Sequence, residues 1–273
     1  RCARGDTNAY WLRDDSDWYM KEGPMSIQRM WEFYRTVEFL TIPHLHPLIR
    51  NQTRFDAINP EKERLIEVHS NHGRYEYHNN QPLFPKKGMV EGNNVQDILA
   101  RGHRLGFVAA SDDHSGRPGS ADLTAVYAPE LTRQAIFQAL RARHTYGTTR
   151  ARMALEFRLG DRLIMGDETF VGERDPLWRS RRFSVRVLGT DTLKLVEIVR
   201  NGKVVYSTQP KGVEARFEYV DPEPLDQVWL GTEKNNPPTV YYYLRVTQQP
   251  DNAPGEQQLG MGWTSPIYLC AAP

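Results

Sequence analysis

Hydrophobic positions before residue 150 follow two different spacings. From residue 26 to 38 they recur every three or four positions, which predicts an amphipathic helix with Ser26 as its N-cap. Residues 39–43 form an apolar run that predicts a short buried strand. Similar patterns predict strands over 64–69, 106–110 and 123–128 and helices over 95–100 and 130–143. Strands alternating with helices favour βαβ units around a largely parallel sheet.

Beyond residue 150 the pattern changes to short apolar or alternating stretches. Seven strands are predicted, over 152–159, 183–188, 193–199, 203–207, 215–220, 240–247 and 265–269. Asn201 and Gly202 separate two of them and are a strong signal for a two-residue hairpin loop. Short strands joined by turns are typical of a β-sandwich. We therefore expect two domains, an α/β domain over 1–147 and a β-sandwich over 148–273.

Composition narrows the class of protein. Apolar residues make up 39% of the chain and charged residues 25%, which is typical of a soluble globular protein. The net charge of +1, from 35 basic and 34 acidic residues, gives no reason to expect a nucleic acid or an anionic membrane surface as partner. No apolar stretch reaches the roughly 18 residues of a membrane span. A small-molecule substrate is the expected partner.

The two ends of the sequence add little chemistry. The chain opens on Arg1 rather than Met, so an upstream segment is expected, and a secretory signal, if there is one, would lie in it. Cys2 and Cys270 match no metal-binding spacing, and they can pair only if the ends of the chain meet.

Histidines concentrate in one part of the chain. Seven of the eight lie between His44 and His114, and several follow predicted strands. In α/β folds the carboxyl ends of the strands carry the chemistry. Imidazole and carboxylate together suit zinc, manganese or iron, so the sequence predicts a divalent-metal site there.

The candidate ligands follow three strands. Asp112 and His114 come after strand 106–110 and can bind one ion or bridge two; the alternative is a turn cap for Asp112 and an ordinary loop position for His114. His44 and His46 are spaced like a chelating pair, although this spacing also arises by chance. Glu67 lies inside an apolar strand, where a carboxylate is costly unless it is paired or bound to a metal.

Three further residues are candidates for catalysis. His69 and His72 follow Glu67 closely and can act as acid or base, as further ligands, or as residues that hydrogen-bond to ligands. Arg117 lies in the loop after His114 and can hold a phosphate or carboxylate bidentately; a solvated loop arginine is the alternative.

Four runs carry a resemblance to a known family. They are 40–44 (LTIPH), 66–73 (IEVHSNHG), 110–119 (ASDDHSGRPG) and 135–140 (AIFQAL). They resemble the PHP (polymerase and histidinol phosphatase) superfamily, in particular its branch with a C-terminal β-domain, whose end is similar to residues 241–248 and 263–268. The resemblance covers nearly the whole chain.

This resemblance implies a distorted (β/α)7 barrel with two or three divalent ions, which hydrolyses phosphate esters with a metal-activated water. Asp112 and His114 match the family's last metal motif, His44 matches its middle histidine with His46 as a rival, and Glu67 matches an acidic strand-end residue.

The family's opening His-x-His motif has no counterpart before residue 44, and only about four barrel strands are legible. We therefore expect this chain to be the C-terminal part of such an enzyme, unable to hold the full set of ions alone. Two alternatives stay open. One is a degenerate, non-catalytic barrel that acts as a binding module, and the other is a metal-dependent hydrolase of carboxylic ester or amide bonds.

Overall fold

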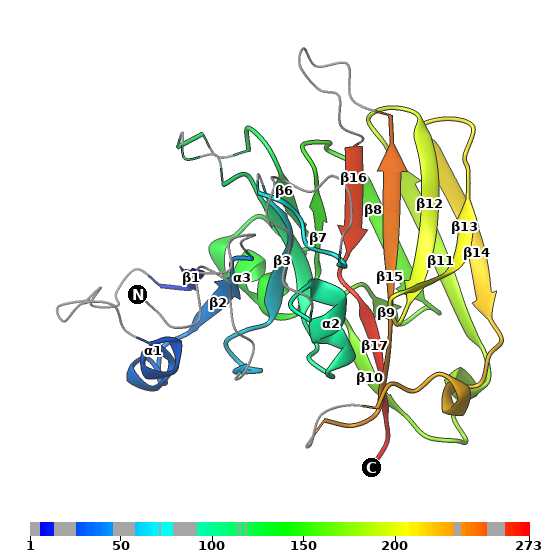
Figure 1. Cartoon of the computed structure of the whole chain (residues 1–273), viewed down its shortest axis with the longest axis horizontal. Helices are drawn as coiled ribbons and strands as arrows, with labels where there is room; N and C mark the ends of the chain where they lie inside the picture. The colour runs from blue at the N-terminus through cyan, green and yellow to red at the C-terminus, as the bar shows by residue number, and fades with distance from the viewer. Residues whose placement is uncertain are drawn as a thin grey trace.

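The computed structural model describes residues 6–13, 26–45, 58–70, 72–78, 92–112, 114, 116–117, 119–231, 236–249 and 260–273. Figure 1 shows the N-terminal elements on one side of the molecule and a large β-structure on the other. No helix in the described ranges is long and apolar enough to cross a membrane.

A small parallel unit forms the centre of the N-terminal part. β3 (Leu65–Ser70) pairs in parallel with β5 (Gly106–Ala110), and β4 (Gly73–Arg74) turns back against β3. Both strands of the parallel pair are buried almost throughout, as expected of strands covered on two faces. α2 (Val95–Ala100) covers this unit with Val95, Ile98 and Leu99. Asn94 starts the helix through a capping box with Asp97.

A second pair of strands lies beside this unit. β1 (Thr7–Trp11) pairs antiparallel with β2 (Phe39–Pro43), which contacts β3 without a strand-to-strand ladder. α1 (Ile27–Phe33) precedes β2, with Ser26 as its N-cap as predicted. The helix is shorter than expected because the chain leaves helical geometry at Tyr34. The Tyr34 amide still donates to the Met30 carbonyl, but the amides of Arg35 and Val37 donate to carbonyls three residues back, as in turns.

The β-structure contains two sheets packed face to face. The larger is formed by β6 (Leu123–Val126), β7 (Thr145–Thr148), β10 (Glu168–Val171), β12 (Leu193–Arg200), β13 (Lys203–Thr208), β15 (Thr239–Gln248), β16 (Gly260–Thr264) and β17 (Ile267–Ala271). The smaller is formed by β8 (Ala154–Leu159), β9 (Leu163–Ile164), β11 (Arg181–Leu188) and β14 (Glu214–Asp221). Two short 3₁₀ helices, η2 (Pro176–Trp178) and η3 (Leu225–Gln227), and α3 (Arg133–Arg141) complete the described elements.

Three adjacent tyrosines on β15 show how the layers stack. All three are buried, although their side chains alternate in direction. Tyr242 packs into the core between the two sheets, where it contacts Phe183 at 4.6 Å between ring centroids. Tyr241 and Tyr243 point the other way, into a core shared with β3, β5 and α2. The large sheet is therefore the middle layer of three (Figure 1).

A buried carboxylate links the outer layer to the middle one. Glu76, which follows β4, accepts hydrogen bonds from the Tyr243 hydroxyl (2.7 Å), Arg245 (2.7 Å) and the Trp263 indole (2.9 Å). Its side chain is fully buried, so all of its hydrogen bonding is satisfied within the protein.

The predicted β-sandwich is confirmed, including the hairpin at Asn201 and Gly202, which joins β12 to β13 with both residues at positive φ. The described residues do not form a (β/α)7 barrel. Of the strands expected in a largely parallel sheet, only β3 and β5 pair in parallel, and β6 pairs antiparallel with β7 in the middle layer. Because β7 also pairs with β16, sheet hydrogen bonding crosses residues 147 and 148, and the domain boundary there stays a prediction.

Candidate metal centre

Three polypeptide segments bring metal-ligating side chains to one point. His44 directly follows β2, His72 lies in the tight connection between β3 and β4, and Asp112 follows β5. One ligand atom of each lies within 4.8 Å of the others. The carboxyl ends of neighbouring strands are the usual place for chemistry in α/β folds, and the sequence pointed to this edge for His44 and Asp112.

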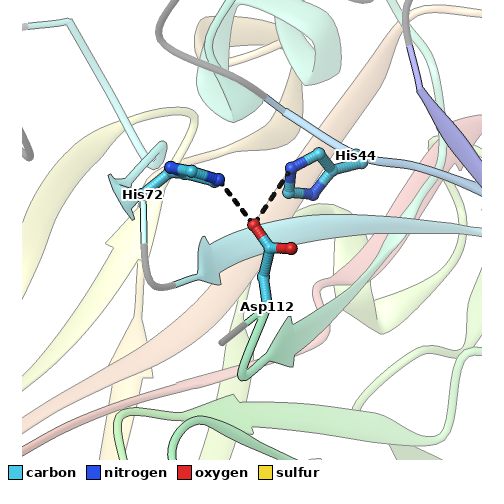
Figure 2. Close-up of side chains that lie close together, drawn as sticks. All are labelled: His44, His72 and Asp112. Atoms are coloured by element: carbon cyan, nitrogen blue, oxygen red, sulfur yellow. Dashed lines mark ion pairs between the residues drawn. The ribbon is translucent and has the colours of Figure 1, made fainter. Parts of the chain in front are cut away.

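The Oδ2 atom of Asp112 lies between the two imidazoles (Figure 2). It is 2.7 Å from Nε2 of His72 and 3.5 Å from Nε2 of His44. This oxygen is buried, yet it has no hydrogen bond with acceptable geometry. A buried carboxylate oxygen without a hydrogen bond is costly, and two ring nitrogens facing it form a donor set that a cation would satisfy.

The backbone at this site is strained. Asp112 and His114 have φ angles of 41° and 54°, in the left-handed region that residues other than glycine rarely adopt. Strain of this kind persists where surrounding structure enforces it, and it concentrates at functional sites. It turns the Asp112 carboxylate back toward β2 and β3.

Glu67 lies behind His44. Its Oε1 atom is 2.9 Å from Nδ1 of His44, and both residues are buried. The imidazole therefore donates from Nδ1 and presents Nε2 to Asp112. The sequence predicted Glu67 as a direct ligand. In the structure it lies outside the group of three and contacts His44 from the side opposite Asp112, and its role as a ligand stays a prediction.

The pKa values of the two imidazoles are shifted in opposite directions. Burial lowers the pKa of His44, but the hydrogen bond to Glu67 and the charges of Glu67 and Asp112 outweigh burial, and the net shift is upward. Burial also lowers the pKa of His72. The charge of Asp112 raises this pKa and the charge of His44 lowers it further, and the net shift is downward.

A cavity of about 710 Å³ opens over the three side chains. Besides these three side chains, the described lining of the cavity comes from β1, from the residue before it, from Glu67 on β3, and from the end of β5 and the segment that follows. The lining residues are Asp6, Thr7, Asn8, Tyr10, His44, Glu67, His72, Ala110, Ser111, Asp112 and His114. No lysine or arginine occurs among these described residues.

His114, Arg117 and His46, which were also predicted from sequence, do not belong to the described group of three ligand atoms. His114 has Nε2 3.3 Å from Oδ1 of Asp112, but its side chain is 81% exposed. Arg117 is exposed and is not among the residues that line the cavity, and the phosphate-holding role predicted for it stays a prediction. His46 lies outside the described residues, as does Cys2, while Cys270 is a buried free thiol.

His69 lies away from the cavity. Its Nδ1 atom is 2.6 Å from Oδ2 of Asp122, and its ring stacks on Trp263 with centroids 5.9 Å apart. The register of β3 against β5 shifts between Glu67 and His69, and this bulge separates two side chains that a regular strand would place on one face. In the structure His69 is thus paired with Asp122, and the catalytic role predicted for it stays a prediction.

Residues on and beside β1 also line the cavity, and sequence reasoning missed them. Asp6, Asn8 and Tyr10 occupy alternate positions and therefore share one side of the strand. The alternation of polar and small residues over 6–10 is a weak strand signal that could have indicated them.

The chain is similar to a family and to relatives whose descriptions give no activity. Residues 56–169 match a family described as "Protein of unknown function (DUF3604)". An uncharacterised protein of Chlamydia pneumoniae is 34% identical over 249 residues, which is 85% of this chain and 38% of the relative. An uncharacterised protein of Chlamydia trachomatis is 31% identical over 252 residues, with the same two coverages. No solved structure matches the chain.

The chain spans 38% of the length of these curated relatives. The matched family segment begins before β3 and ends within β10, so it contains His72 and Asp112 but not His44.

Proposed function

We propose that the protein is a metal-dependent hydrolase, a phosphoesterase that acts through a metal-activated water. His44, His72 and Asp112 are the proposed ligands. The observation that carries the proposal is the buried Asp112 Oδ2 atom, which has no hydrogen bond and faces the Nε2 atoms of two histidines. Glu67 supports it by fixing the ring of His44 from behind.

The donor set fits a divalent transition metal. Two imidazole nitrogens and one carboxylate suit zinc, manganese or iron. Three protein ligands at the floor of an open cavity leave a position for water, which distinguishes catalytic from structural metal sites. A bound ion of this kind lowers the pKa of its water to about 7.

The finer fold and the full metal content belong to the same proposal. We infer that β2, β3 and β5 are strands of a partial PHP-like barrel, because the ligands follow the carboxyl ends of all three. The complete protein would then hold two or three ions, with ligands from strands beyond this part of the chain.

One residue that is not a proposed ligand, His114, has a proposed task in the reaction. His114 is exposed at the cavity with Nε2 near Asp112, so its imidazole is placed to pass a proton to the leaving group. Asp112 holds that ring through its Oδ1 atom while Oδ2 faces the other two histidines.

A second candidate is a metal-dependent hydrolase of carboxylic ester or amide bonds. It is favoured by the charge of the cavity, whose described lining has carboxylates but no lysine or arginine. A phosphoryl group would depend on the metal for all of its charge neutralisation there, whereas a neutral ester or amide needs less.

A panel assay decides between these candidates. Protein loaded in turn with Zn²⁺, Mn²⁺ or Fe²⁺ is tested on p-nitrophenyl phosphate, bis(p-nitrophenyl) phosphate, p-nitrophenyl acetate and an anilide, beside Asp112→Ala. Metal-dependent cleavage of the phosphate esters, lost in Asp112→Ala, supports the proposal. Selective cleavage of the acetate or anilide supports the second candidate. Metal binding without any cleavage would leave a binding module and overturn both.

A further inference from the structure

We propose that β1 is the substrate-recognition wall of the cavity, with Asn8 and Tyr10 binding an uncharged, hydroxyl-rich group, such as a sugar ring, of the molecule to be hydrolysed. The inference rests on the proposed function for the identity of the reacting bond. It assigns a separate task to a strand that supplies none of the three proposed ligands.

The placement of β1 is fixed by the strand that carries His44. Asn8 pairs with Ile42 and Tyr10 with Leu40 in the ladder to β2, and the His44 amide donates to the Asp6 carbonyl at 3.1 Å. The side chains of Asn8 and Tyr10 therefore project on one side of β1, beside the candidate ligands.

The opposite side of β1 is anchored by aromatic packing. Trp11 stacks on Phe39 with ring centroids 4.6 Å apart and meets Tyr34 edge to face at 4.7 Å. A strand held this way presents its other side without a large ordering cost on binding. Binding residues on such a rigid element are preorganised.

The charges on this wall select against an anion. Asp6 contributes a carboxylate at one end of β1, and Asn8 and Tyr10 are uncharged. A metal ion at His44, His72 and Asp112 would neutralise the floor of the cavity but leave Asp6 negative. A hydroxyl group can donate to that carboxylate, whereas a second phosphate would be repelled by it.

The side chains on the wall match a polyol. Tyr10 is 46% exposed beside the cavity, and its ring can cover the apolar C–H face of a sugar. The Asn8 amide offers a donor and an acceptor to neighbouring hydroxyls. The Tyr10 hydroxyl, whose ordinary pKa is about 10, is protonated at neutral pH and can donate to a sugar hydroxyl.

The test compares two monoesters that carry the same phosphate. Metal-loaded protein is assayed on glucose 6-phosphate and on n-hexyl phosphate, for wild type, Asn8→Ala and Tyr10→Ala. Tyr127→Ala, which removes a tyrosine of similar exposure outside the cavity, is the matched control. We expect wild type to prefer the sugar ester in kcat/KM by about tenfold or more, the worth of one to two net hydrogen bonds. Each β1 variant should reduce that ratio, while the control keeps it.

Equal kcat/KM for both esters, or an unchanged ratio in Tyr10→Ala, would overturn the inference while the proposed function stands. A separate binding measurement covers the case in which neither ester is hydrolysed. Saturation-transfer NMR with methyl glucoside then reports the wall directly: a signal lost in Tyr10→Ala supports β1 as a sugar-binding wall although the proposed function fails. No signal in wild type would reject the wall as well.

Discussion

Glu67 and His44 form a buried carboxylate–imidazole pair in which the carboxylate is 2.9 Å from Nδ1 and the opposite ring nitrogen faces Asp112. The pairing fixes both the tautomer and the orientation of the imidazole. If His44 binds a metal as proposed, Glu67 determines which ring nitrogen it presents to the ion.

Replacing Glu67 with Gln should weaken metal binding without abolishing it. Carboxylates behind metal-bound histidines contribute about 10- to 100-fold in affinity, and an amide keeps the shape but not the charge. The affinity is measured by competition with a chromogenic chelator. Glu61→Gln, at an exposed position before β3, is the control and should bind like wild type. Complete loss of the metal in Glu67→Gln, with the fold intact by circular dichroism, would instead make Glu67 a direct ligand.

His69, on β3, and His72, in the connection from β3 to β4, should respond differently to substitution. His72→Ala removes a proposed ligand and should abolish stoichiometric binding at micromolar metal. His69→Gln breaks the contact to Asp122 and should lower the melting temperature while leaving the bound metal unchanged. Elemental analysis beside thermal melting checks both. The reverse pattern, with metal lost only in His69→Gln, would refute the assignment of these roles.

Glu76 should matter for stability rather than for metal binding. Glu76→Gln leaves Arg245 with a weaker partner and turns one acceptor oxygen into a donor facing Trp263 or Tyr243. Disrupting a buried charged network typically costs about 3–5 kcal/mol, and we expect a loss of that order in the free energy of unfolding by urea. Exposed Glu173→Gln is the control. A change within about 0.5 kcal/mol of wild type, as at ordinary surface sites, would contradict the anchoring role.

Local patterns predicted the elements that local physics determines. The apolar run of β2 and that of β5 fall at the predicted residues, because a short buried run between turn signals has few alternatives. The Asn201–Gly202 hairpin was predicted because only a few residue types adopt two consecutive positive φ angles.

The pairing of strands that are distant in sequence could not be predicted from local patterns. Nothing local distinguishes a β6 that joins β3 in parallel from one that joins β7 antiparallel, since both leave an apolar run. The bulge between Glu67 and His69 depends on the register with β5, and it sends the two side chains to different partners. His72 lies beside His44 and Asp112 because the short turn into β4 brings it back over the end of β3.

Acid should destabilise the protein partly through Asp221. Burial raises the pKa of this carboxyl, but the Tyr242 hydroxyl (2.7 Å), the Glu223 amide and the charges of Arg181 and Arg200 outweigh burial, and the net shift is downward. Because the folded-state pKa lies below the unfolded value of about 3.9, this contribution is present above that value and is lost as pH falls through the folded-state pKa.

The measurement is the free energy of urea unfolding from pH 6 down to pH 2.5. Wild type should lose stability with a steeper slope below about pH 4 than Asp221→Asn, which is less stable at neutral pH but lacks this titration. Parallel slopes for the two proteins would show that the Asp221 carboxyl does not titrate with a depressed pKa.

Metal content tests the central claim most directly. The protein is saturated with Zn²⁺ or Mn²⁺, freed of loose metal by gel filtration and measured by inductively coupled plasma mass spectrometry beside Asp112→Ala and the exposed control Asp161→Ala. We predict at least one ion per chain in wild type and in the control, and close to none in Asp112→Ala, because the Asp112 Oδ2 atom faces both histidine nitrogens. A metal-free wild type, or an Asp112→Ala variant that retains its ion, would contradict the proposed centre.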